Sequence, residues 1–102
     1  MSAPFEVLLY YKYCRISDPD AYADEHRKLC CQLELRGRIL IAAEGINGTV
    51  SGTVENCEKY RKALDEDPLT AEIVWKIDPL EGHVFPKLSV KVRDEVVALG
   101  LG

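Results

Sequence analysis

The sequence predicts an α+β fold in which two helices cover one face of a mostly antiparallel sheet. The expected elements follow one another as strand, helix, strand, strand, helix, strand, strand. Both helical segments carry apolar residues at spacings of three and four, and a Gly-rich turn separates the two middle strands. This order matches the ferredoxin-like split βαβ plan, written βαββαβ(β), in which the second face of the sheet stays open.

The first strand is expected at 5–13, because FEVLLYYKY is aromatic and branched and contains neither Gly nor Pro. A helix over 18–34 follows. Asp18 or Ser17 can cap its free amides, Pro19 suits its first turn, and Gly37 marks its stop. The residues expected to face the core are Tyr22, His26, Leu29, Cys30 and Leu33.

A hairpin is expected in the middle of the chain. The apolar run RILIAA at 38–43 predicts a strand covered on at least one face. The dipeptide Asn47-Gly48 favours positive backbone angles, so we place the turn there, before a strand at 49–51.

The second half of the chain adds one helix and two strands. Thr53 can cap a helix that runs to about Asp67, with Val54, Cys57, Tyr60 and Leu64 as its buried stripe. Strands are expected at 73–77 and 88–93.

Size and charge bound the functions that this chain can have. Its 102 residues, 47% hydrophobic and 29% charged, are typical of one globular domain. Thirteen basic and seventeen acidic residues give a net charge of −4, which argues against bulk electrostatic binding of nucleic acid. The expected helices at 18–34 and 55–67 hold ten acidic and five basic residues, so the remainder sums to +1. A local anion-binding surface away from the helices is therefore compatible with the composition.

Neither a membrane segment nor a signal peptide is recognisable. The longest uncharged apolar run, 39–43, is far shorter than the ~20 residues that a membrane helix needs. We expect a cytoplasmic protein.

The thiols and imidazoles show no metal-ligand spacing, so neither a metal nor a cofactor is expected. The four cysteines lack a C-x-x-C pair, and His26 and His83 have no partner at i+4. Cys30, Cys31 and Cys57 fall on or near helical stripes and are expected to be inert core thiols. Cys14 stands beside Arg15, where a cation could lower its pKa and make it reactive.

Strand alternation predicts which side chains stand on the open face. In the last strand Lys87, Lys91 and Arg93 alternate with the apolar residues, which must face the helices. By the same reasoning Tyr10 and Lys12 of the first strand and Lys76 before the last loop are expected to join them. Such a face could hold phosphates and stack a base, or its cations could simply solvate an exposed sheet.

Three stretches of the chain resemble one protein family: YYKYCRISDPDAYADEHRKLC at 10–30, GRILIAAEGINGTVSGT at 37–53 and GHVFPKLSVKVRDEVVALGL at 82–101. They are similar to the N-terminal, acylphosphatase-like domain of the bacterial rhodanese-related proteins that use oxygen to hydroxylate the wobble uridine of tRNA. The runs EGINGTVSG and FPKLSVKVR are the most specific parts of this resemblance.

The resemblance implies that residues 1–102 form a single acylphosphatase-like domain, the N-terminal part of a longer parent. The catalytic cysteine of that family lies in a following rhodanese-type domain, so none of the four cysteines here inherits its role. We therefore expect no hydroxylase activity from this domain alone. Its expected partners are tRNA, through the parent protein, and the rhodanese-type domain. The residues favoured for such contacts are Arg15, Asn47, Lys87, Lys91 and Arg93.

Two alternatives stay open. The domain could be a scaffold whose open face packs on its neighbour, which predicts apolar side chains on that face. It could also hydrolyse acyl phosphates, with Arg15 binding phosphate and Asn47 orienting water. The sequence disfavours the second alternative, because the loop 13–19 lacks the glycines of a phosphate cradle and Asn47 is expected in a turn, whose geometry alone explains it.

Overall fold

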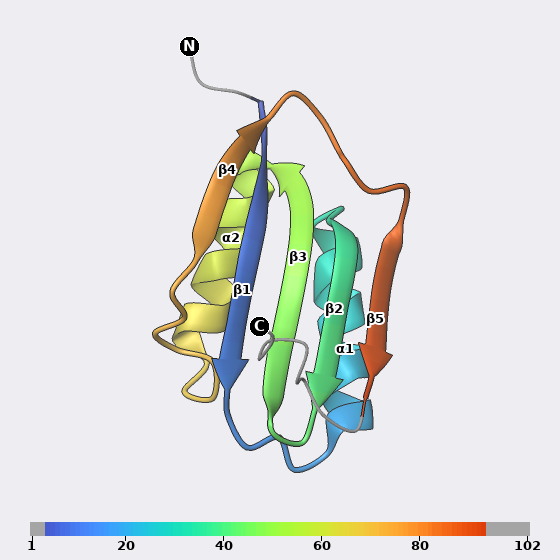
Figure 1. Ribbon diagram of the computed structural model, residues 1–102, viewed down its shortest axis with the longest axis vertical. Coiled ribbons are helices and arrows are strands. Elements are labelled where there is room, and N and C mark those ends of the chain that lie inside the picture. The colour runs from blue at the N-terminus through green and yellow to red at the C-terminus, as the bar shows by residue number, and fades with distance from the viewer. Residues whose placement is uncertain (1–3, 94–102) are drawn as a thin grey trace.

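The computed structural model describes residues 4–93 and confirms the predicted α+β architecture. Its elements are β1 (Phe5–Tyr13), α1 (Pro19–Gln32), β2 (Arg36–Ala42), β3 (Gly45–Thr53), α2 (Val54–Glu66), β4 (Lys76–Leu80) and β5 (Leu88–Val92) (Figure 1). The sheet order is β4-β1-β3-β2-β5; β5 runs parallel to β2 and every other pair is antiparallel. Residues 94–102 lie outside the described part of the chain, and they include the end of the 82–101 stretch on which the family resemblance partly rests.

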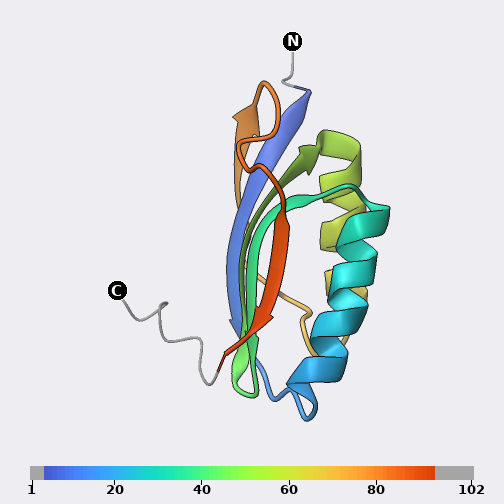
Figure 2. The same cartoon turned by 90° about the vertical axis from the view of Figure 1, so that its right-hand side faces the viewer.

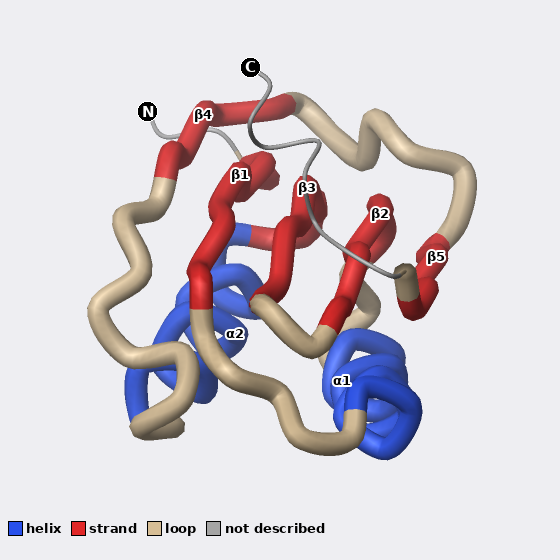
Figure 3. Tube along the Cα trace, turned by 60° about the horizontal axis from the view of Figure 1, so that its bottom comes forward, coloured by secondary structure: helices blue, strands red, loops and turns tan. Residues whose placement is uncertain are grey.

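Both helices lie on one side of the sheet and leave its other side uncovered (Figures 2 and 3). We call this second side the open face. The predicted caps hold the helices in place: the Asp18 carboxylate accepts from the Ala21 amide at 3.2 Å, and the Thr53 hydroxyl accepts from the Asn56 amide at 3.1 Å. No helix among the described residues is long and apolar enough to cross a membrane.

The core lies between the helices and the inner face of the sheet. Aliphatic side chains from the three central strands meet the buried stripes of the two helices. Its largest fully buried members include Tyr60, Leu8, Ile39, Ile41, Ile46, Val50, Cys30 and Cys57. This packing decides which side chains of every strand point inward, and alternation sends their neighbours to the open face.

A hydrogen-bonded aromatic cluster crosses the middle of the core. The Tyr60 hydroxyl bonds the hydroxyl of Tyr10 and lies 2.5 Å from Nε2 of His26, so the buried polar atoms of these side chains satisfy one another. The Trp75 ring packs on Tyr10, with centroids 4.6 Å apart. Burial lowers the pKa of His26 to about 4, which keeps the imidazole neutral.

The hairpin prediction was wrong about the position of the turn. Ala43 and Glu44 form it, and Asn47-Gly48 lies inside β3. Gly48 is needed for packing, because a Cβ there would lie 2.6 Å from Cζ of the Tyr10 ring. An Asn-Gly pair can therefore occur inside a strand, where the glycine makes room for an aromatic ring, as well as in a tight turn.

Two further boundaries also differ from the prediction. Gly37 does not stop α1, which ends at Gln32; it lies in β2 with φ 145°, where a Cβ would lie 2.1 Å from the Thr49 carbonyl oxygen. The strand expected at 73–77 is displaced to β4 at Lys76–Leu80, and Trp75 precedes it as a core-packing residue.

Candidate nucleic-acid interface

Strand register places the open-face side chains in rows that cross the sheet. Tyr11 pairs with Asn47, Asn47 with Leu40, and Leu40 with Lys91. Paired residues in neighbouring strands point to the same face. This row, which we call the Tyr11 row, therefore runs from an aromatic ring on β1 through an amide on β3 to a cation on β5.

Cations concentrate on the half of the open face that β2 and β5 form. A groove of about 560 Å³ lies there, and four of its lining residues are basic and exposed. We call this the basic groove; its basic residues are Arg38, Lys87, Lys91 and Arg93. Backbone bonds from Gly37 to Lys87 (3.0 Å) and from Arg93 to Ile41 (2.8 Å) extend the pairing of the two strands to both ends of the groove.

The charge of the open face contrasts with that of the whole chain. By register and groove lining, this face holds six basic side chains, against one carboxylate on its described strands, Asp78, and the exposed Glu44 in the turn between β2 and β3. The basic side chains are Arg36, Arg38, Lys76, Lys87, Lys91 and Arg93. Although the net charge is −4, the open face is therefore strongly basic.

Aromatic side chains occupy the other half of the open face. Tyr11 and Tyr13 of β1 are 55% and 59% exposed, and their ring centroids lie 6.0 Å apart at an interplanar angle of 78°. Leu9 stands in the next row and is 36% exposed. The two rings contact each other edge to face and, with Leu9, form an exposed apolar patch, a feature that often marks a contact surface.

The end of the open face at which β1 begins is covered by the loop between β4 and β5. Nδ1 of His83 lies 2.9 Å from the Ser51 hydroxyl, and the imidazole meets the Phe5 ring at 5.0 Å. Burial and the nearby Arg36 lower the pKa of His83. The accessible part of the face is therefore the part that holds Tyr11 and the basic groove.

The structure places four of the predicted residues on the open face, as expected, and two on the helix side. Lys76, Lys87, Lys91 and Arg93 lie on the open face as expected. Tyr10 is only 4% exposed and bonds Tyr60 in the core. Lys12 pairs with the buried Ile46, so it too belongs to the helix side.

The sequence prediction missed four residues of the open face: Tyr11, Tyr13, Arg36 and Arg38. The side chains of β1 alternate between two faces, and both faces carry aromatic and aliphatic residues. The pattern alone therefore did not show which face of the strand points to the core. Gly48 was the available signal, because a glycine opposite Tyr10 leaves room for an inward ring. Arg38 was overlooked because 38–43 was interpreted as a continuous apolar run, and Arg36 because the strand was expected to begin only at 38.

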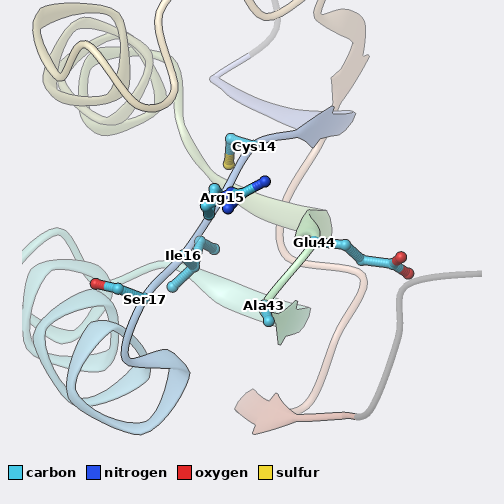
Figure 4. Close-up of a pocket in the computed structure, with 6 residues that line it drawn as sticks. All are labelled: Cys14, Arg15, Ile16, Ser17, Ala43 and Glu44. Carbon is cyan, nitrogen blue, oxygen red and sulfur yellow. The ribbon is translucent and has the colours of Figure 1, made fainter.

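Arg15 and Asn47, the candidate acylphosphatase pair, do not line the same pocket. Arg15 lines a separate pocket of about 590 Å³ with Cys14, Ile16, Ser17, Ala43 and Glu44 (Figure 4). Asn47 stands on the open face opposite Tyr11. The Cys14 and Ile16 amides already donate to the Glu44 and Ala43 carbonyls at 3.0 and 2.9 Å, so they cannot cradle a phosphate.

The cysteines do not form a reactive centre. Burial raises the pKa of Cys14, contrary to the lowering that its neighbour Arg15 suggested, and the hydrogen bond of its thiol goes to the Lys12 carbonyl at 3.9 Å. Cys30 and Cys57 are buried as expected, whereas Cys31 is exposed, which corrects its assignment to the core. Among the described residues, no three His, Cys, Asp or Glu side chains gather as a metal site.

Exposure predicts the order in which the thiols react. With iodoacetamide at neutral pH, Cys31 should be alkylated first and Cys14 no faster than an ordinary free thiol, because its raised pKa leaves little thiolate. Peptide mass spectrometry over a time course measures both rates. Faster labelling of Cys14 than of Cys31 would contradict this ranking, and Cys31→Ser serves as the control.

The structure is that of a ferredoxin-like α+β domain with a basic open face. Among solved structures, the dark state of BlrB, a BLUF protein, superposes with a TM-score of 0.74 over 98% of this chain and 81% of the other, at 21% identity. At that identity the likeness concerns the fold alone. The chain belongs to the family described as the UPF0176 acylphosphatase-like domain, whose model matches residues 5–96.

Curated relatives confirm the family resemblance predicted from the sequence. The tRNA uridine(34) hydroxylase of Bacillus licheniformis is 52% identical over 99% of this chain and 31% of its own length. That of Staphylococcus saprophyticus is 55% identical over 95% of this chain and 31% of its own length. The chain therefore spans about a third of the curated relatives that it matches.

Proposed function

We propose that this domain is a non-catalytic tRNA-binding part of a tRNA uridine(34) hydroxylase, and that its basic groove contacts the RNA backbone. The single observation that carries the proposal is the concentration of four cations in one groove of an otherwise acidic chain. Exposed lysines and arginines bind phosphates by releasing counterions, which gives affinity without a strongly positive net charge.

The side chains present in the described residues support a non-catalytic role. The open face offers cations, phenols and amides, and its one described serine–histidine pair, Ser51 with His83, is inaccessible because Ser51 is fully buried. The buried thiols have raised pKa values, Cys30 and Cys57 to about 12, so they are poor nucleophiles. Oxygen-dependent hydroxylation would be performed by another part of the longer relatives, for which a rhodanese-type domain remains our expectation.

A specific observation also favours docking as a second candidate function. Leu9, Tyr11 and Tyr13 are apolar surface on the open face, as the scaffold hypothesis required. They occupy β1, while the cations occupy β2 and β5, so a neighbouring domain could cover one half of the face and leave the groove free.

The salt dependence of binding tests the proposal. The 102-residue chain should bind tRNA with an affinity that falls steeply between 50 and 200 mM salt. For four phosphate contacts the plot of log affinity against log salt concentration should have a slope of about −3. A slope near zero, or no binding at the lowest salt concentration, would refute the proposed function.

A further inference from the structure

We propose that the open face binds unpaired nucleotides, with bases stacked on Tyr11 and Tyr13 and phosphates held by Lys91 and Arg93. This inference rests on the proposed function and deepens it, because it names single-stranded RNA as the ligand. The relevant side chains come from opposite halves of the same sheet and are joined by the rows that cross it.

The rows give each base a phosphate partner. In the Tyr11 row, the aromatic ring and Lys91 are separated by three inter-strand spacings, about 14 Å between Cα atoms. One nucleotide and an extended lysine side chain can bridge this distance. Tyr13 begins the next row on this face and pairs with Gly45, which pairs with Ala42. Arg93 comes one residue after Val92, the partner of Ile41, so it extends this row beyond Ala42. Rows on the same face recur at every second residue of a strand. A bound RNA strand would therefore pass from the Tyr11 row to the row that begins at Tyr13.

Asn47 lies between the ring and the cation in the Tyr11 row. It is partly exposed, and its side-chain amide can both donate and accept hydrogen bonds. This is the chemistry required to contact the polar edge of a base that stacks on the adjacent ring. The position of Asn47 within β3, rather than in a turn, gives this side chain a role that turn geometry does not explain.

The geometry of the two tyrosines favours unpaired bases over a duplex. Their ring planes meet at 78°, so bases stacked on both rings would lie at a similarly steep angle to each other and not in the parallel stack of a continuous strand. Two bases that used the two rings would have to separate from each other. In a duplex the bases are already stacked and paired, so their faces are unavailable to protein side chains.

The exposed aromatic surface is small and is bordered by polar side chains, a composition that suits a stacked base with a polar edge. On the described open face the large exposed apolar side chains are Leu9, Tyr11 and Tyr13. Polar residues border them on both sides: Asn47 and Thr49 on β3, and Lys76 on β4. Interfaces between domains typically bury about 600 Å² or more, so a docked domain would have to cover the polar border as well as these three side chains.

Two RNA probes and two pairs of variants test the inference. The probes are a single-stranded uridine hexamer and an RNA duplex with a similar number of phosphates. Tyr11→Leu with Tyr13→Leu removes both rings, and Tyr11→Phe with Tyr13→Phe keeps them. Because both side chains are more than half exposed, these changes leave the core intact, which a thermal melt can verify.

We expect the hexamer to bind at least 10-fold more tightly than the duplex. The double leucine variant should lose roughly 10-fold or more of its affinity for the hexamer, with an unchanged salt slope, because stacking releases no counterions. The double phenylalanine variant should bind within about 3-fold of the unaltered chain, since the ring faces remain. In the unaltered chain, the hexamer should also shift the ring-proton resonances of Tyr11 and Tyr13 upfield.

Equal binding of both probes, or leucine variants that bind as the unaltered chain does, would overturn the inference. If replacing Lys91 and Arg93 by Gln still weakens binding in that case, the proposed function stands and the tyrosines serve another purpose, such as docking. If neither set of variants changes the affinity, the proposed function fails as well.

Discussion

Replacing Lys87, Lys91 and Arg93 together by Gln should lower the affinity of the chain for tRNA by roughly 10- to 100-fold at 100 mM salt. All three residues line the basic groove and are exposed. Each lost phosphate contact should reduce the magnitude of the salt slope by about 0.7 to 0.9, so the triple variant should lose about 2. Fluorescence anisotropy with labelled tRNA at several salt concentrations measures both quantities.

The chain offers a control with the same change of charge. Lys28, Lys59 and Lys62 are exposed on the two helices, on the opposite side of the sheet. Their replacement by Gln also removes three positive charges, but it should leave the salt slope within experimental error. Equal losses in the two triple variants would mean that binding follows net charge, and the assignment of the groove would then be wrong.

Acid should destabilise the fold through His26. Burial holds the pKa of its folded form at about 4, whereas an unfolded histidine has a pKa near ~6.5. As the pH falls from 6.5 towards 4, the unfolded chain therefore takes up a proton that the folded chain does not. Stability from this group is fully present above pH 6.5 and is lost over that interval, by about 3 kcal/mol in total.

Urea unfolding at a series of pH values between 7 and 4.5 measures this loss. His26→Gln should remove most of the pH dependence above pH 5, whatever it does to stability at pH 7. His83→Gln is the matched control and should retain it, since His83 is partly exposed in a surface loop. A flat stability profile in the unaltered chain, or an unchanged profile in His26→Gln, would contradict this origin.

Most of the fold follows from local patterns in the sequence. The caps Asp18 and Thr53, and the apolar stripes at spacings of three and four, defined both helices to within two residues. The errors came from tertiary packing. Gly37 and Gly48 looked like local signals for a helix stop and a turn, yet both accommodate atoms of a neighbouring strand. Such a requirement is not visible until strands are paired.

The candidate site was only partly predictable for the same reason. The alternation of β5 has one clearly apolar face, so the outward direction of Lys87, Lys91 and Arg93 was certain once the strand was recognised. In β1 both faces are apolar enough to be buried, and only the pairing of Tyr10 with Gly48 decides between them. The prediction therefore chose Tyr10, while Tyr11 and Tyr13 form the exposed pair.

The most direct measurement is an NMR titration of the chain with an anticodon stem-loop that carries uridine at the wobble position, at two salt concentrations. We predict salt-sensitive shifts confined to the open face, at Tyr11, Lys91, Arg93 and their row neighbours, with α1 and α2 unaffected. Shifts spread over the helices, or none at a large excess of RNA, would contradict the claim that this face binds tRNA.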